Sequence, residues 1–361
     1  MFEPSRSDCH AWASHPLFST PAHLADWVAT VRTDAERTGV RVVNCYLGYG
    51  TYATLGLAHH HAGVRHHLSH SWMMAMMRTA GALNVGLGFF AHAFSEKVLR
   101  DKTLYDRSYR NLVDTIRRLA AAAPATGVKT FGVEQMYTPH QVPWTLGCTA
   151  DFLRRTNAGN PGLPAYITLD TGHQSGQRKF LVPQAADLER MITAVRADKP
   201  CDTYLGPREH YARFMDMVKK GTTAADLAAA VATHARENPH LFARPEDGDT
   251  YAWLGRYAAY SPIIHLQQTD GTVSAHRNFI PALESWGIIK ALAVLRAIAQ
   301  SFEGPVPEGF PPRVTELYLT LEPFLGTAAH ARRELEEIAQ SVAYWRQARA
   351  CNRTSISSIF P

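Results

Sequence analysis

The apolar positions of this chain follow two different repeats that alternate along the sequence. Short runs of β-branched and aromatic residues, such as those at 40–47 and 85–93, are typical of buried strands. Longer segments place apolar residues three and four apart, as in 21–38 and 104–123, which indicates amphipathic helices. Strands that alternate with helices of this length predict parallel βα units.

The alternation continues through most of the chain. It predicts strands at 9–13, 40–47 and 85–93, and four more that end at Glu134, Asp170, His265 and Glu322. It predicts helices at 21–38, 68–82, 104–123, 149–156, 280–302 and 328–348. We therefore expect an α/β fold of the TIM (β/α)8-barrel type. The pattern contains seven candidate strands and the first is weak, so this barrel has an atypical or missing first strand.

Residues 184–250 interrupt this rhythm. They contain three helical patterns, at 186–197, 208–219 and 224–237, with no convincing strand between them. We interpret the segment as a helical insertion that serves as a lid or an oligomer contact. The whole chain, residues 1–361, is then one barrel domain that carries this insertion.

Composition narrows the possible functions. A hydrophobic content of 46% and a charged content of 19% favour a packed core over disorder. The net charge of +5 is mild and no long basic run occurs, which argues against nucleic-acid binding. Five scattered cysteines without a CxxC pair argue against a disulfide scaffold and favour the cytoplasm. No signal peptide or membrane span is expected.

Four of the predicted strands end in a side chain that a buried strand should not contain. These residues are Glu134, Asp170, His265 and Glu322. In a barrel of parallel strands the C-terminal ends meet at one mouth, where the active sites of this fold lie. Three carboxylates and an imidazole that meet there need a neutralising partner, and a divalent cation is the simplest one.

The segments around these four residues carry a family resemblance. Val-Glu134-Gln-Met, Leu-Asp170-Thr-Gly-His173, Ile-Ile-His265-Leu-Gln-Gln and Leu-Glu322-Pro-Phe resemble the xylose-isomerase-like TIM-barrel superfamily of sugar-phosphate isomerases and ketose 3-epimerases. Residues 251–257 and 261–271 are similar to erythrulose-phosphate 3-epimerases. The resemblance covers about 40–183 and 248–326 and leaves out the insertion.

The resemblance implies an isomerase that epimerises a ketose or ketose phosphate through a cis-enediolate. It implies one divalent ion held by Glu134, Asp170, His265 and Glu322, with Mn²⁺ expected and Mg²⁺, Co²⁺, Zn²⁺ or Fe²⁺ as alternatives. The two glutamates would also form the acid-base pair. His173 would contact the substrate, and we expect Gln268 and Arg277 to bind it too. Dimers or tetramers are common among relatives.

Three features depart from the family pattern: the first strand, the long insertion and the segment 274–279. A metal-dependent dehydratase, an oxygen-using enzyme of the same superfamily, or a non-catalytic ligand-binding descendant therefore remain as alternatives. A histidine cluster at 59–70 is interpreted as a loop that lines the mouth, with a second metal site as the other reading.

Overall fold

The structure is a computed structural model that describes residues 8–10, 20–47, 56–91, 93–324 and 328–351. Within these ranges, seven strands form one parallel sheet in which each strand pairs with the next along the chain. They are β1 (Asp8–His10), β2 (Asn44–Leu47), β3 (Gly86–Phe89), β4 (Phe131–Glu134), β5 (Ala165–Asp170), β6 (Ile263–Leu266) and β7 (Tyr318–Leu321).

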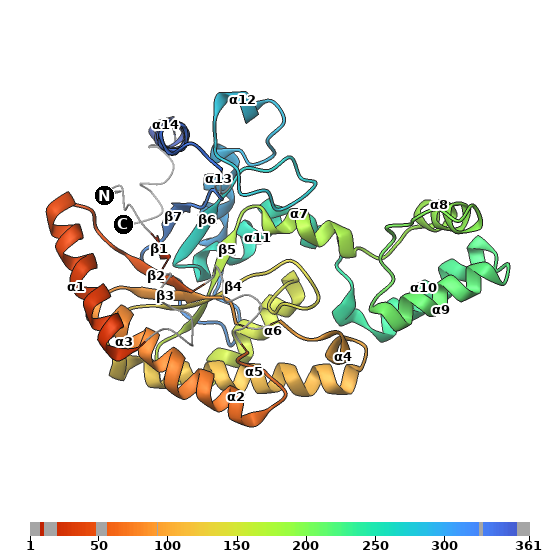
Figure 1. Cartoon of the computed structure of the whole chain (residues 1–361), viewed down its shortest axis with the longest axis horizontal. Helices are drawn as coiled ribbons and strands as arrows, with labels where there is room; N and C mark the ends of the chain where they lie inside the picture. The colour runs from red at the N-terminus through yellow and green to blue at the C-terminus, as the bar shows by residue number, and fades with distance from the viewer. Residues whose placement is uncertain (1–7, 11–19, 48–55, 92, 325–327, 352–361) are drawn as a thin grey trace.

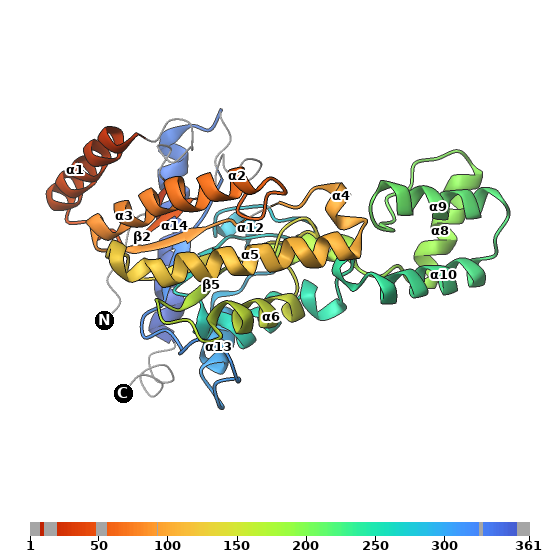
Figure 2. The same cartoon turned by 90° about the horizontal axis from the view of Figure 1, so that it is seen from below.

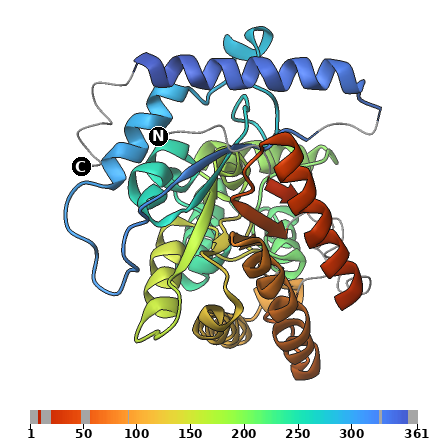
Figure 3. The same cartoon turned by 90° about the vertical axis from the view of Figure 1, so that its left-hand side faces the viewer.

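The sheet curls around a central axis and carries its helices on the outside (Figure 3). The seven predicted strands are confirmed, including the weak first one, whose residues 11–13 lie outside the described ranges. No eighth strand occurs in the described part of the chain, and β1 and β7 stand at the two ends of the strand order. The α/β barrel-like class is therefore confirmed with seven strands instead of eight.

Helices follow the strands as expected for βα units. Those of the barrel are α1 (Pro21–Thr38), α2 (Ala62–His66), η2 (His67–Met73), α3 (Met74–Leu83), α4 (Glu96–Leu99), α5 (Lys102–Ala122), η3 (Ala123–Thr126), α6 (Leu146–Asn157), α7 (His173–Gln177), η4 (Arg178–Phe180), η6 (Pro245–Gly248), α11 (Thr250–Tyr257), η7 (Ala258–Tyr260), α12 (Pro281–Glu284), α13 (Ala291–Ser301) and α14 (Ala331–Cys351). None of the described helices has the length and apolar character needed to cross a bilayer.

Local signals in the sequence set the helix ends. At the start of α1 the Thr20 hydroxyl accepts a hydrogen bond from the backbone N–H of His23, and Pro21 occupies the first turn. Gly39 ends this helix with a φ of 67°, which glycine adopts without strain. In α5 the Asp101 carboxylate caps the first turn by accepting from Leu104 N–H.

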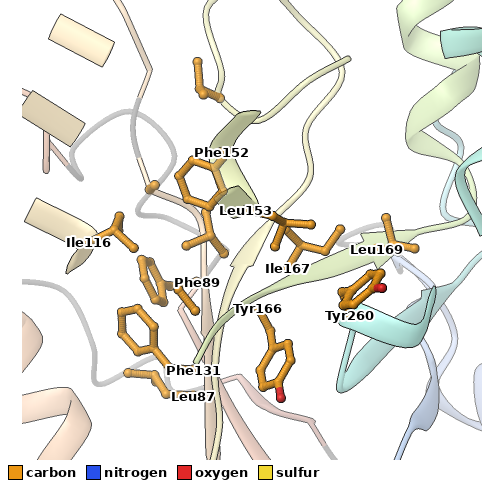
Figure 4. Packing of buried hydrophobic residues seen from close by; sticks show 14 of the residues in the cluster. Leu87, Phe89, Ile116, Phe131, Phe152, Leu153, Tyr166, Ile167, Leu169 and Tyr260 are labelled. Atoms are coloured by element: carbon orange, nitrogen blue, oxygen red, sulfur yellow. The ribbon is translucent and has the colours of Figure 1, made fainter. Parts of the chain in front are cut away.

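The main core lies between the strands and the helices that cover them (Figure 4). The rings of Phe89 on β3 and Phe131 on β4 pack 4.9 Å apart, with Ile116 of α5 beside them. Leu153 of α6 and Ile167 of β5 extend the same layer. Because these side chains are almost completely buried, they hold β3, β4 and β5 in fixed register for the polar residues at the strand ends.

The helical insertion projects from the barrel as a separate arm (Figures 1 and 2). It contains α8 (Ala185–Arg196), α9 (Arg208–Lys219) and α10 (Ala224–Glu237), followed by η5 (Pro239–Leu241). A parallel β-bridge between Leu181 and Ala243 joins the two segments that connect the arm to the barrel. The chain is thus back at the barrel by Ala243, earlier than the expected boundary at 250.

One predicted helix is wrong in its extent. The expected helix over 280–302 is divided into the short α12 and the later α13, with an irregular segment between them. The backbone N–H and C=O of Ile289 in that segment are both bonded to the side chain of Gln268. A tertiary contact of this kind competes with helical hydrogen bonds and overrides the local pattern.

Candidate metal centre

The four predicted strand-end residues meet at the mouth of the sheet. Glu134 and Asp170 are the last residues of β4 and β5, His265 lies in β6, and Glu322 directly follows β7. The register pairs Asp170 with His265, and the backbone N–H of Glu322 donates to Leu266 O at 3.0 Å. Glu134 pairs with Thr168, two positions before Asp170, and His265 pairs with Thr320, two positions before Glu322. The four residues are therefore staggered along the strands but still meet at the same end of the sheet. Each offers a ligand atom, and these atoms lie within 4.8 Å of one another.

The cluster is closed to solvent and rich in unsatisfied acceptors. His265 Nδ1 lies 3.2 Å from Glu322 Oε2 and 3.5 Å from Glu134 Oε1. Among the described residues, one oxygen of each carboxylate, in Glu134, Asp170 and Glu322, is buried without a hydrogen bond. Such oxygens are costly unless an ion binds them. Three oxygens and one imidazole nitrogen suit Mn²⁺, Co²⁺, Fe²⁺ or Zn²⁺, so the residues fit a divalent ion.

The charges of the cluster influence one another strongly. Burial raises the pKa of Asp170, and the neighbouring Glu322 adds to the effect. Burial alone would also raise the pKa of Glu322, but His265 and His276 outweigh it and hold that pKa well below its usual value. A bound cation would lower the pKa of both carboxyl groups and so favour their deprotonated forms.

Three donors orient the Asp170 carboxylate through Oδ1 and leave Oδ2 facing the cluster. Its Oδ1 accepts from Gly172 N–H, from His173 N–H and from the side-chain amide of Gln267, at 2.7, 3.1 and 2.6 Å. A Cβ on Gly172 would lie 2.3 Å from the Gln267 side chain, so only glycine permits this approach. Because Oδ1 is saturated, Oδ2 is the oxygen that can bind an ion.

His173, the predicted substrate contact, lies beside Asp170. Its Nδ1 is 2.7 Å from the backbone oxygen of Gln135, and since a carbonyl only accepts, Nδ1 carries the proton. The ring packs 4.7 Å from that of Tyr137 and 6.1 Å from that of His276. Asp170, His173 and His276 also form a second group whose ligand atoms lie close together. His173 is therefore next to the four-residue cluster with its other nitrogen able to accept.

The structure does not bring the side chains of Gln268 and Arg277 into the cluster. The Gln268 amide bonds to the backbone of Ile289 and of Thr269. The Arg277 guanidinium lies over the ring of Trp286, 5.5 Å from its centroid. Gln268 and Arg277 also pair through their backbones and so close the loop that follows β6.

Gln267 and His276 approach the cluster instead, and neither was expected from the sequence. Side chains two positions apart in an extended strand point to the same side. Gln267 therefore shares a side with His265, whereas Gln268 points away. This alternation was the signal that could have identified Gln267. His276 lies in an irregular loop, where no periodic signal exists.

The histidine cluster at 59–70 stays apart from these groups. His61 Nδ1 accepts from Gly63 N–H and so caps α2, and the rings of His66 and His70 stack 4.0 Å apart. Among the described residues, none of these histidines belongs to a group of three potential ligands. Residues 48–55, which precede the cluster, lie outside the described ranges.

Comparisons with known proteins give a partial sequence match and a similarity of fold. No protein-family model matches the chain. D-erythrulose 1-phosphate 3-epimerase of Brucella abortus (strain 2308) is 34% identical over 103 residues. That match covers 28% of this chain and 30% of the relative, so less than a third of the curated relative is matched.

Solved structures show the fold over a longer stretch. The crystal structure of a candidate xylose isomerase from Rhodospirillum rubrum gives a TM-score of 0.62 at 13% identity, covering 92% of this chain and 86% of the other. A D-tagatose 3-epimerase-like protein gives 0.48 at 12% identity, with coverages of 92% and 85%. The first of these confirms the xylose-isomerase-like fold that the resemblance implied.

Proposed function

We propose that this chain is a divalent-metal-dependent epimerase or isomerase of a ketose or ketose phosphate, which acts through a cis-enediolate. The observation that carries the proposal is the buried cluster of Glu134, Asp170, His265 and Glu322, in which three carboxylate oxygens lack hydrogen-bond donors. The partial similarity to an erythrulose-phosphate epimerase supports the same chemistry. Asp170 and His265 would hold the ion together with both glutamates.

The chemistry requires that a proton leave the carbon next to a carbonyl. A bound divalent ion supplies the positive charge that makes such a proton acidic enough to remove. One glutamate takes the proton as the C–H bond breaks, and its electron pair moves toward the carbonyl oxygen. The other glutamate returns a proton to the same carbon. Glu134 ends β4 and Glu322 follows β7, with His265 between them, which suits delivery from opposite faces and hence epimerisation.

His173 completes the proposed site. With its proton on Nδ1 and bonded to Gln135 O, its second nitrogen can accept a hydrogen bond from a substrate hydroxyl. Tyr137 packs against the imidazole and limits its movement. His173 thereby orients the substrate relative to Glu134 and Asp170, and the buried surroundings exclude competing water.

The proposal is tested by metal analysis of the purified chain, followed by incubation with ketoses and ketose phosphates in deuterated water. D-Erythrulose 1-phosphate is the first substrate to try, because of the sequence match. We expect about one divalent ion per chain and deuterium on the carbon next to the carbonyl. The labelled carbon distinguishes an epimerase from an aldose-ketose isomerase.

Two outcomes would overturn the proposal. A bound ion with no deuterium exchange on any ketose would favour a dehydratase or an oxygen-dependent enzyme at the same site. Chain that binds no divalent ion after reconstitution would contradict the role given to Glu134, Asp170, His265 and Glu322. A chelator-treated sample is the control for exchange that does not depend on the ion.

A further inference from the structure

The loop that follows β6 links two of the four cluster residues to each other. At its start, the Gln267 side-chain amide donates to Asp170 Oδ1 at 2.6 Å and to Ser274 Oγ at 3.0 Å. At its end, His276 Nδ1 lies 3.2 Å from the backbone oxygen of Glu322 and 3.4 Å from its Oε2. The loop thus spans from a carboxylate on β5 to a carboxylate that follows β7.

Both ring nitrogens of His276 have polar partners in this network. The Glu322 backbone oxygen can only accept, so His276 Nδ1 carries a proton. Its Nε2 lies 3.3 Å from Ser274 Oγ and 3.2 Å from Gln267 Nε2, whose two N–H groups are given to Asp170 Oδ1 and Ser274 Oγ. Nδ1 is therefore bonded to Glu322 and polar partners lie beside Nε2, which together fix the orientation of the ring.

The imidazole is also held by packing and by the backbone. Its ring stacks on Phe324 at 3.7 Å with an interplanar angle of 3°. Phe324 N–H donates to His276 O at 2.9 Å, and His276 N–H donates to the Gln267 side-chain oxygen. The orientation of His276 is therefore set from three directions.

The backbone of His276 is in a conformation that L-residues rarely adopt. Its φ is +45°, in the left-handed region, although the side chain carries a Cβ. Such a conformation is strained and persists where surrounding contacts determine it. Glycine or asparagine would adopt it more readily. The contacts of the imidazole and of its backbone hold this conformation in place.

We propose that His276 is a positioning residue for Glu322: its Nδ1–H holds the Glu322 backbone oxygen, and its ring lies 3.4 Å from Oε2, so that the carboxylate faces the cluster. Gln267 does the same for Asp170, so one loop orients two ligands on either side of His265. This inference rests on the proposed function, because Glu322 is there a metal ligand and one of the acid-base pair. Groups that orient metal ligands in this way commonly change metal affinity by about 10- to 100-fold when they are removed.

The test compares two substitutions at the same position. His276→Asn keeps a residue that tolerates a positive φ and places an amide N–H near the position of Nδ1. His276→Leu has a comparable bulk but no donor. The readouts are the Co²⁺ dissociation constant, the visible absorption of the Co²⁺-loaded chain, and kcat and KM for the ketose. Circular dichroism of the metal-free chains checks that both variants fold.

We expect His276→Leu to bind Co²⁺ about 10- to 100-fold more weakly, to shift the Co²⁺ absorption bands and to lower kcat more than it raises KM. His276→Asn should stay within about threefold of the unsubstituted chain in affinity and keep its bands. Leu and Asn variants that lose affinity equally would overturn the proposal, because the loss would then not follow the donor. So would a folded Leu variant with unchanged affinity and bands.

The two proposals fail in different ways. If the unsubstituted chain binds Co²⁺ but exchanges no ketose proton, the proposed function is wrong, while the Co²⁺ affinities still decide the role of His276. If the chain is an active epimerase and His276→Leu behaves like it, only the positioning role is wrong. Two ions per chain, with one lost in His276→Leu, would make His276 a ligand and would also overturn the positioning role.

Discussion

At the scale of single residues, the site combines groups that burial would normally penalise. Glu134 and Asp170 are each 1% exposed, and His265 is fully buried. A buried carboxylate without donors loses several kcal/mol of hydration unless a partner replaces the water. The same residues contact one another at distances suited to an ion. Their cost in the metal-free protein is therefore the free energy that metal binding would recover.

Replacing Glu134 with glutamine separates metal binding from proton transfer. Glu134→Gln keeps an oxygen that can bind an ion but loses the carboxylate base. We expect the variant to retain part of its metal binding and to lose epimerisation by about 100- to 10,000-fold. Because Glu322 remains, one epimer should still exchange its proton with deuterated water. NMR of each epimer measures this exchange, and equal exchange from both would contradict a two-face mechanism.

The sequence predicted part of this site and missed the rest for a physical reason. Glu134, Asp170 and Glu322 were identifiable because each interrupts an apolar run at its C-terminal end. The sequence analysis predicted Gln268 as a substrate contact, whereas Gln267 is the residue that approaches the cluster. Side chains alternate between the two sides of an extended chain, and this rule was not extended beyond His265. His276 depends on a loop conformation with positive φ, which no local pattern in the sequence specifies.

At the scale of elements, the arm is built as a unit with its own small core. Leu188, Phe214, Leu227 and Val231 are buried against one another and form a cluster separate from that of the barrel. Its helices α9 and α10 begin and end where the helical pattern predicted them, because most of their apolar side chains pack within the arm. The helix expected over 280–302 does not form as one helix, for the opposite reason. The side chain of Gln268, from the loop after β6, binds the backbone of Ile289.

Salt bridges and hydrogen bonds fasten the base of the arm to the barrel. Arg100 pairs with Glu209 at the start of α9, and Glu96 accepts from the Arg208 backbone N–H. His240 Nε2 lies 2.9 Å from Leu99 O. All three contacts fall on or next to α4, which follows β3 at the mouth. The arm is therefore anchored to the segment that follows β3.

A buried histidine in the arm predicts a pH dependence. Burial lowers the pKa of His234 from 6.5 to about 4, and the nearby His210, Arg213 and His240 add positive charge. Between pH 6.5 and about 4 the unfolded arm binds more protons than the folded arm, so the stability of the arm falls as pH falls through this window. Each pKa unit corresponds to about 1.4 kcal/mol.

Hydrogen exchange of peptides from α9 and α10 measures this effect. We expect exchange in the arm to accelerate between pH 7 and pH 5, after correction for the intrinsic rate, with less change in the barrel strands. His234→Phe keeps a ring of similar shape and removes the titrating group, so it should reduce the slope. The lowered pKa values of His210 and His240 leave a smaller residual dependence. An unchanged slope in His234→Phe would contradict the assignment.

At the scale of the whole molecule, the candidate site joins parts of the chain that are far apart in sequence. Its residues come from four consecutive strands of one sheet, β4 to β7, and the arm is inserted between β5 and β6. The parallel order could be predicted, because strands alternate with helices. The direction of the arm could not, because it depends on contacts between residues that no sequence pattern relates.

A metal held by four strands should stabilise the whole fold. Binding that favours the folded chain adds about 2.7 kcal/mol when the free ion is a hundredfold above its Kd. We therefore expect Mn²⁺ or Co²⁺ to raise Tm and a chelator to lower it. Asp170→Asn keeps the oxygen that accepts from Gly172, His173 and Gln267 but weakens metal binding. Calorimetry should show that it melts like the metal-free chain and responds little to the ion.

The outcome that would count against this view is an Asp170→Asn variant that gains as much Tm from the ion as the unsubstituted chain. A large loss of Tm in metal-free Asp170→Asn would also be unexpected. Burial raises the pKa of Asp170, so a neutral amide should be tolerated there.

The bridge between Leu181 and Ala243 has a consequence for how such a protein can change. It holds the two ends of the arm side by side, and Ala243 N–H donates to Phe180 O at 2.8 Å. The two points where the arm joins the barrel are therefore held at a fixed spacing. The entropy lost when the segment between them is closed into a loop varies only slowly with the length of that segment. Segments of very different size could be exchanged at this point over evolution, or spliced in by an engineer, without redesign of the barrel.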